Sequence, residues 1–236
     1  MQLFYNPSLD NNIHQFSFDK EESRHIVKVL RKKEGDELFI TNGKGELFTA
    51  EIILADVNNC KASIISTQKN HPKMYRLHLA VAPTKSTERF EWFLEKATEI
   101  GVHEITPIIC DHSERRILKM ERLQKVVQSA MKQSLRTYLP KVNNPVPYEE
   151  FIAQDHQELL FIAHCEEEEK LDLKRCIAAD KDVTILIGPE GDFSHKEIKE
   201  AYEKGFLPIS LGEARLRTET AALVACTAVT LINSGS

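Results

Sequence analysis

Two short glycine-containing segments in the last quarter of the chain carry the residue types best suited to chemistry. Gly188-Pro189-Glu190-Gly191 follows the apolar run VTILI, and Leu211-Gly212 follows LPIS. Glycine lets backbone N–H and C=O groups approach a ligand more closely than a Cβ atom allows. Arg215 and Arg217 follow the second glycine, and arginine beside such a turn suits contact with phosphate or carboxylate. This pattern predicts a small-ligand pocket, with plain structural turns and a solvated loop as the alternatives.

The two segments match neither GxGxxG nor GxxxxGK[ST], so nothing in them points to NAD or to a nucleoside triphosphate. Ser194 and Glu197 have the spacing of a capping box, which predicts that a helix begins there. Thr218 is expected to cap the last helix. Both segments are predicted to lie at the carboxyl ends of parallel strands, where open α/β sheets bind ligands.

The chain after about residue 76 alternates between predicted strands and helices. The strands are expected at residues 77–83, 104–110, 158–164, 183–189 and 207–212. The helices are expected at residues 88–99, 121–135, 194–204 and 218–232, with Gly101 ending the first of them. Such alternation predicts an α/β fold with a mostly parallel sheet and helices on both faces.

The first seventy residues show a different pattern of predicted secondary structure. Short β-rich runs lie between Glu37 and Ser66, and Asn42-Gly43 between two of them is a hairpin signal. Residues 21–30 are the one helical stretch expected here. We therefore predict a small β-barrel, joined to the rest of the chain by a linker around residues 69–72.

The composition is that of an ordinary soluble protein. Of the 236 residues 42% are hydrophobic and 28% charged, and the net charge of −5 excludes a protein that coats nucleic acid by bulk charge. The five cysteines are widely spaced without a CxxC pair, which argues against a disulfide framework and a structural zinc site. The first residues do not resemble a signal peptide, and residues 221–232 are too short to cross a bilayer. We expect a cytoplasmic protein with no metal and no membrane partner.

Basic side chains are concentrated locally. Residues 23–33 contain five basic side chains and no acidic one, and residues 112–141 contain eight basic and two acidic ones. Residues 149–172 hold nine acidic side chains against a single lysine. This segregation is typical of a face that binds nucleic-acid phosphates, with a solvated helix face as the alternative. The candidate RNA-binding residues are Arg24, His25, Arg31, Arg115, Arg116 and Arg136.

The segment IGPEGDFSHKE followed by LGEARLRTETAAL closely resembles the C-terminal signature of the ribosomal RNA small subunit methyltransferase E family. The resemblance covers nearly the whole chain. It includes ArgHis at 24–25, AsnGlyLysGly at 42–45, LysAlaThrGluIleGly at 96–101 and GlnSerLeuArg at 133–136. The chain differs at Asp192 and Leu135, where the family commonly has glycine, and at Lys132, where a glutamate is usual.

The resemblance implies an S-adenosylmethionine-dependent enzyme of the SPOUT class that methylates N3 of a uridine in 16S rRNA of the small ribosomal subunit. It also implies a PUA-like β-barrel over residues 1–71, a methyltransferase domain with a trefoil knot over residues 72–236, and a homodimer. By matching position, three loops would hold the cofactor. Their candidate residues are His164, Ile187, Gly188, Pro189, Gly191, Leu211, Gly212, Arg215, Leu216 and Thr218.

Methylation of N3 requires alignment of the base and removal of the N3 proton. Arg217 is the candidate to orient the base or stabilise its developing charge, and Glu190 or Glu219 the candidate to relay the proton. For each glutamate, pairing with a helix N-terminus is the alternative. Two other functions stay open: a catalytically silent RNA-binding or assembly factor, and a related enzyme that modifies another RNA atom or a tRNA.

Overall fold

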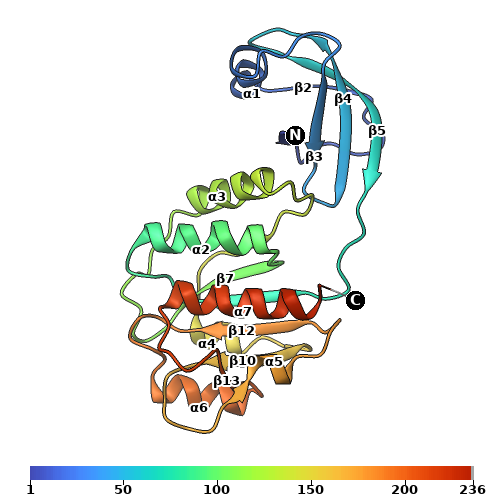
Figure 1. Ribbon diagram of the computed structural model, residues 1–236. Coiled ribbons are helices and arrows are strands. Elements are labelled where there is room, and N and C mark those ends of the chain that lie inside the picture. The colour runs from blue at the N-terminus through green and yellow to red at the C-terminus, as the bar shows by residue number, and fades with distance from the viewer. Residues whose placement is uncertain (235–236) are drawn as a thin grey trace. The chain divides into compact units, whose positions relative to one another are not determined.

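The computed structural model describes residues 1–234, which divide into two compact units (Figure 1). The first unit consists of Met1–Pro72 and Met131–Leu139. The second consists of Lys73–Ala130 and the chain from Pro140 onward. The sequence placed a boundary after residue 71 but gave no sign that residues 131–139 return to the first unit.

The first unit is built on a mixed five-stranded sheet. Its strands are β1 (Leu3–Tyr5), β2 (Gln15–Ser17), β3 (Glu37–Thr41), β4 (Glu46–Leu54) and β5 (Lys61–Lys69), in the order β1-β3-β4-β5-β2. The β1–β3 pair is parallel and the others are antiparallel. The predicted helical stretch is α1 (Lys20–Arg24) followed by the π-helical turn η1 (His25–Val29). β1 and β2 were missed because three residues are too few to show an alternating pattern.

The Asn42-Gly43 hairpin is confirmed, since β3 and β4 pair across residues 42–45. Gly43 and Gly45 have φ values of 75° and 96°, in the region that favours glycine. A Cβ atom on Gly45 would overlap the ring of Tyr138. Backbone hydrogen bonds join Gly45 N–H to Thr137 O and Leu139 N–H to Gly43 O, both at 2.9 Å. These contacts place residues 131–139 in the first unit.

The second unit is an α/β layer structure around a parallel sheet. Its strands are β6 (Leu77–Val81), β7 (Glu104–Ile109), β8 (Lys141–Val142), β9 (Val146–Pro147), β10 (Leu159–Ala163), β11 (Leu171–Asp172), β12 (Val183–Ile187) and β13 (Leu207–Ser210). Their order is β11-β13-β10-β12-β6-β7-β8, and β9 pairs with β7. Every pairing is parallel.

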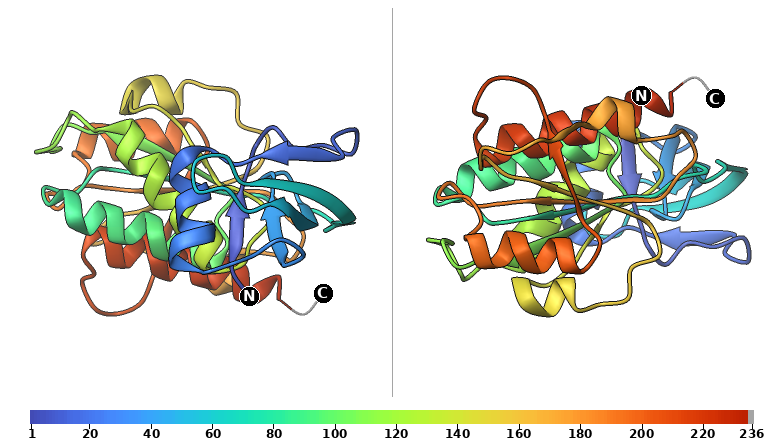
Figure 2. Two further views of the ribbon diagram at one scale, coloured as in Figure 1. Left: turned by 90° about the horizontal axis from the view of Figure 1, so that it is seen from above. Right: turned by 90° about the horizontal axis from the view of Figure 1, so that it is seen from below.

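Helices cover both faces of this sheet, as the alternation predicted. The helices of the second unit are α2 (Thr87–Ile100), α3 (Met120–Gln133), α4 (Tyr148–Ile152), α5 (Leu173–Cys176), α6 (His195–Glu203) and α7 (Thr218–Ile232). The last three residues of α3 belong to the first unit. α2 and α7 lie side by side on one face, and α4 and α6 lie on the other (Figures 1 and 2). All five residues of β12 are buried, because it lies between β10 and β6. None of the helices in residues 1–234 is long and apolar enough to cross a membrane.

The predicted helix boundaries agree with the structure to within one or two residues. Ser194 and Glu197 form the predicted capping box at the start of α6, and Gly101 ends α2 at a φ of 118°. α3 ends at Gln133 rather than residue 135, because Leu135 adopts a left-handed φ of 56° that a helix cannot contain.

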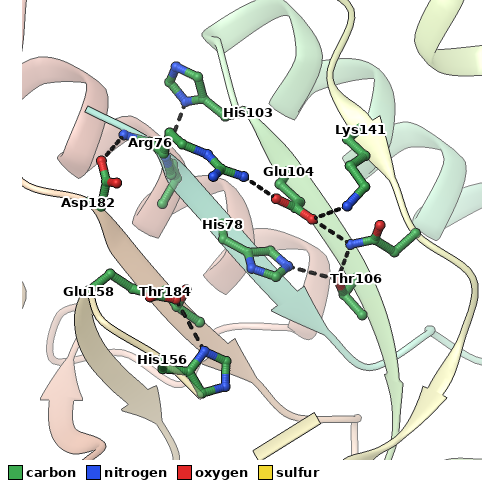
Figure 3. Close-up of polar contacts among 12 residues, drawn as sticks. Arg76, His78, His103, Glu104, Thr106, Lys141, His156, Glu158, Asp182 and Thr184 are labelled. Carbon is green, nitrogen blue, oxygen red and sulfur yellow. Dashed lines mark hydrogen bonds and ion pairs between the residues drawn. The ribbon is translucent and has the colours of Figure 1, made fainter. Parts of the chain in front are cut away.

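A polar cluster lies at the amino-terminal end of β6 and β7, opposite the strand ends that carry the glycine segments (Figure 3). Glu104 accepts hydrogen bonds from Lys141 Nζ at 2.9 Å and Asn143 Nδ2 at 2.8 Å. The His78 Nε2 and Thr106 Oγ1 atoms lie 2.7 Å apart, and Asn143 Nδ2 donates to the same hydroxyl at 2.7 Å. The cluster therefore joins three neighbouring strands through side chains.

Burial dominates the titration of His78 and lowers its pKa to about 4. Burial by itself would raise the pKa of Glu104, but hydrogen bonds from Asn143 and Lys141 hold it at about 2. Both shifts favour the neutral imidazole and the ionised carboxylate in the folded protein.

We expect replacement of His78 by asparagine to remove part of the acid sensitivity of the second unit. The unfolded chain binds a proton at His78 below pH 6.5, and the folded chain does so only below about pH 4. Protonation of His78 in the unfolded chain therefore lowers the free energy of unfolding as the pH falls from 6.5 toward 4, and has no effect above that range. Between pH 7.5 and 5 the wild type should lose about 2 kcal/mol more unfolding free energy than the variant. Glu104 contributes little in that window, because its usual pKa of 4.5 lies below it.

The measurement is urea unfolding followed by the fluorescence of Trp92, the single tryptophan, which lies on α2 of the second unit. An identical loss of stability in the wild type and the His78→Asn variant would contradict the prediction.

Candidate active site

A pocket of about 670 Å³ lies where β10, β12 and β13 end. These strands are neighbours in the order β13-β10-β12, so the loops that follow them meet at one edge of the sheet. The loop after β10 begins at His164, the loop after β12 at Gly188, and the loop after β13 at Leu211. The strand order thus brings together three segments that are widely separated in the chain.

Most of the predicted site residues line this pocket. They are His164, Ile187, Gly188, Pro189, Glu190, Leu211, Gly212, Arg215, Leu216, Arg217 and Thr218. Gly191 and Glu219, both among the described residues, are not part of the lining. Lys170 and Asp192 line the pocket without having been predicted. Two features of the sequence could have indicated these residues. Lys170 is a single lysine that directly follows four glutamates, and Asp192 directly follows the glycine segment.

The expectation that Thr218 caps the last helix is wrong. Arg217 is the N-cap residue of α7, and Thr218 is already helical. The Thr218 hydroxyl donates instead to the carbonyl oxygen of Gly188 at 2.9 Å. It reaches that carbonyl because β12 ends beside the start of α7, and the bond joins the loop after β12 to the first turn of α7.

The two glycines of the segment after β12 are closely packed against neighbouring residues. A Cβ atom on Gly188 would lie 3.0 Å from the Phe193 ring and 3.2 Å from the Phe193 backbone nitrogen. A Cβ atom on Gly191 would lie 3.0 Å from His112 Cβ. Gly212, in the loop after β13, has a φ of 132°, and a Cβ atom there would meet nothing within 4 Å. Close packing favours glycine at the first two positions, and backbone conformation favours it at the third.

Hydrogen bonds from neighbouring loops hold this glycine segment. Glu190 Oε1 accepts from the Lys85 N–H at 2.9 Å. His112 Nδ1 lies 3.1 Å from Gly191 O and 3.0 Å from Asp192 O, so it donates to these carbonyls. The segment is therefore fixed from the carboxyl ends of β6 and β7 as well as by its own strand.

His164 presents a buried polar atom to the pocket region. Its side chain is 0% exposed, and its Nε2 lies 2.8 Å from Tyr202 Oη and 3.0 Å from Glu168 Oε1. Burial lowers the pKa of His164, which favours the neutral ring. Its Nδ1 is buried and has no hydrogen-bond partner within the described residues. A polar ligand in the pocket would satisfy such an atom.

The predicted catalytic residues occupy different environments. Arg217 and Glu190 are exposed at the pocket, whereas the Glu219 side chain is 7% exposed and lies 3.9 Å from Arg89 Nε. Glu219 Oε2 is buried without a hydrogen-bond partner in the described chain. The arrangement favours Glu190 over Glu219 for contact with a ligand.

The predicted RNA-binding residues are distributed over both units. In the first unit Arg24 lies in α1, Arg136 lies in the segment 131–139, and Arg31 lines a shallow hollow with Lys32 and Lys33. The ring of His25 packs edge-on against Phe4, with 6.4 Å between the ring centroids.

In the second unit two of these arginines order the loop after β7. Arg115 donates from Nε and Nη2 to Lys85 O at 3.0 and 2.6 Å, and Arg116 donates to Asp111 O at 3.3 Å. RNA binding by all six residues stays a prediction.

Among the described residues no group of three His, Cys, Asp or Glu side chains is arranged to hold a metal ion.

Comparison with known proteins identifies the family. The RNA methyltransferase domain matches residues 70–230, and the RNA methyltransferase PUA domain matches residues 18–65. The ribosomal RNA small subunit methyltransferase E of Buchnera aphidicola is 33% identical over 234 residues, which covers 93% of this chain and 89% of the relative. The chain belongs to the ribosomal RNA small subunit methyltransferase E family.

Solved structures agree with membership of the methyltransferase E family. A probable rRNA methyltransferase from Porphyromonas gingivalis matches with a TM-score of 0.92 at 41% identity, covering 99% of both chains. The methyltransferase E of Neisseria gonorrhoeae, solved bound to S-adenosyl methionine, matches with a TM-score of 0.84 at 28% identity, covering 99% of this chain and 98% of that one. The expected combination of a SPOUT-type parallel-sheet domain and a PUA-like domain is confirmed. The trefoil knot stays a prediction.

Proposed function

We propose that this protein uses S-adenosylmethionine to methylate N3 of a uridine in 16S rRNA of the small ribosomal subunit. The observation that carries the proposal is the pocket formed by the loops after β10, β12 and β13. A methyltransferase E with the same fold, from Neisseria gonorrhoeae, was solved with S-adenosyl methionine bound.

The residues of the pocket fit this cofactor. Gly188 and Gly212 line the pocket without a Cβ atom, which suits an adenosine that is recognised by main-chain hydrogen bonds. The unpartnered Nδ1 of His164 offers a further polar contact. Leu211 and Leu216 supply apolar surface in the same lining. When bound, S-adenosylmethionine supplies the electrophilic methyl group.

The residues of this chain would orient the base and remove its proton. Methylation replaces the N3–H bond of uracil by an N3–C bond, so a base must accept that proton. Glu190 is the better placed of the two candidate glutamates, since it lines the pocket and Glu219 does not. Arg217 would contact the uracil oxygens, whose negative charge grows as the proton leaves.

The basic segments of residues 23–33 and 112–141 would bind the RNA backbone. N3 lies on the Watson–Crick edge, so the target base has to be unpaired or flipped out to reach the pocket.

We also propose that the protein acts as a homodimer in the cytoplasm, in which the partner subunit completes the RNA-binding surface.

The test combines purified protein, labelled S-adenosylmethionine and small ribosomal subunits from a strain that lacks the modification. Nuclease digestion and mass spectrometry then locate the label. We expect N3-methyluridine at one position of 16S rRNA. Label on another atom or only on tRNA would overturn the assignment of the target, and cofactor binding without transfer to any RNA would contradict the proposed activity. Failure to bind the cofactor at all would favour a silent RNA-binding factor.

A further inference from the structure

We propose that Asp192 is a positioning residue of the cofactor pocket, whose carboxylate ties the loop after β12 to the loop after β10. This inference rests on the proposed function, because the ligand that the bridge would serve is S-adenosylmethionine. Asp192 and Cys165, the two ends of the bridge, both line the pocket.

The carboxylate makes one hydrogen bond in each loop. Asp192 Oδ2 accepts from the Cys165 N–H at 2.7 Å, and Oδ1 accepts from the Phe193 N–H at 2.8 Å. The first bond joins residues 27 positions apart in the chain. Backbone N–H bonds to an ionised carboxylate are stronger than bonds between neutral groups. The link is therefore a specific connection between two walls of the pocket.

The backbone of Asp192 adopts a conformation that few residues other than glycine, asparagine and aspartate adopt readily. Its φ is 64°, in the left-handed region that favours glycine and is unfavourable for most other residues. The turn itself has other support, because the Asp192 N–H donates to Pro189 O at 2.9 Å and His112 bonds the carbonyls of Gly191 and Asp192. The side chain is thus not required to form the turn. What the carboxylate adds is its bonds to the N–H groups of Phe193 and Cys165, of which only the second reaches another loop.

Together with Thr218, this bridge connects all three loops. The bond from the Thr218 hydroxyl to Gly188 O joins the loop after β12 to the start of α7, directly after the loop that follows β13. The bond from Cys165 to Asp192 joins the loops after β12 and β10. Loss of the Asp192 carboxylate would remove this link between the loop that begins at His164 and the loop after β12, and would leave the bond from Thr218 to Gly188 in place. Ligand binding costs less free energy when the loops that line the pocket are already ordered before the ligand binds.

The experiment compares glycine substitutions at two aspartates that share a conformation. Asp192→Gly removes the carboxylate and also relieves the left-handed backbone, and Asp192→Asn keeps one acceptor oxygen. Asp180→Gly is the matched control, since Asp180 has a φ of 59° and does not line the pocket. For each full-length protein, calorimetry gives the dissociation constant of S-adenosylmethionine, and amide hydrogen exchange in the ligand-free state gives the protection of Cys165. Thermal unfolding shows that each variant is folded at the temperature used.

We expect Asp192→Gly to bind S-adenosylmethionine about tenfold more weakly and to exchange the Cys165 amide about tenfold faster. Asp192→Asn should fall between this variant and the wild type, and Asp180→Gly should match the wild type in both measurements. An affinity loss in a folded Asp192→Gly protein separates positioning from damage to the fold.

Two results would overturn the inference: unchanged cofactor affinity in Asp192→Gly, or unchanged exchange at Cys165. If the wild type itself does not bind S-adenosylmethionine, the proposed function fails by that result alone. The exchange rate of Cys165 in Asp192→Gly would then still decide whether the carboxylate holds the two loops together.

Discussion

Replacement of Arg217 by alanine is expected to lower the rate of methyl transfer at least about a hundredfold, with little change in cofactor affinity. Arg217 lines the pocket at the start of α7 with an exposed side chain, so its removal leaves the packed core intact. A guanidinium there can donate to the uracil oxygens as N3 loses its proton, a contact that strengthens in the transition state.

Single-turnover rates on small ribosomal subunits, with the cofactor dissociation constant measured separately, test this expectation. Arg217→Lys distinguishes charge from geometry, because lysine keeps the charge without the planar group and should recover only part of the rate. Arg175→Ala is the control, since that side chain is 86% exposed on α5 and does not line the pocket. Normal turnover by Arg217→Ala would remove the residue from the mechanism.

Replacement of Gly212 by alanine is expected to weaken S-adenosylmethionine binding at least about tenfold. The φ of 132° at Gly212 is closed to residues with a Cβ atom, so alanine must change the backbone of the loop after β13. That loop lines the pocket over residues 211–217. A shift in its backbone therefore moves one wall of the pocket, although the alanine methyl group itself would meet no other atom within 4 Å.

Gly205→Ala provides the matched control for this substitution. Gly205 also has a positive φ, 87°, with nothing within 4 Å of its Cβ position, but it follows α6 and does not line the pocket. Both variants should lose on the order of 1 kcal/mol of unfolding free energy from backbone strain. Only Gly212→Ala should lose cofactor affinity by calorimetry. Equal affinity in the two variants would assign Gly212 a purely conformational role.

Glu190 and Glu219 are unequal candidates although they are alike in sequence. Glu190 lies two residues after Gly188, and Glu219 lies two residues after Arg217, in the other signature segment. Neither position in the sequence indicates whether the side chain is buried. In the structure Glu190 is exposed at the pocket and bonds the Lys85 N–H, whereas Glu219 is turned into the body of the unit beside Arg89. Which of two glutamates meets a ligand is decided by packing that the local sequence does not encode.

Local sequence patterns predicted most of the longer helices and strands of this protein. The apolar run VTILI predicted the buried strand β12, Ser194 with Glu197 predicted the start of α6, and Gly101 predicted the end of α2. These signals act between residues a few positions apart, through side-chain periodicity, capping and backbone conformation. The glycine segments and the family resemblance then indicated which loops form the pocket.

How those loops meet depends on contacts between distant parts of the chain. The order β13-β10-β12 depends on pairing between strands that are far apart in the chain, and so do the bonds from Thr218 to Gly188 and from Cys165 to Asp192. The return of residues 131–139 to the first unit has the same origin. Such contacts depend on how distant segments share buried surface and hydrogen bonds in the whole fold, and a local sequence pattern does not encode them.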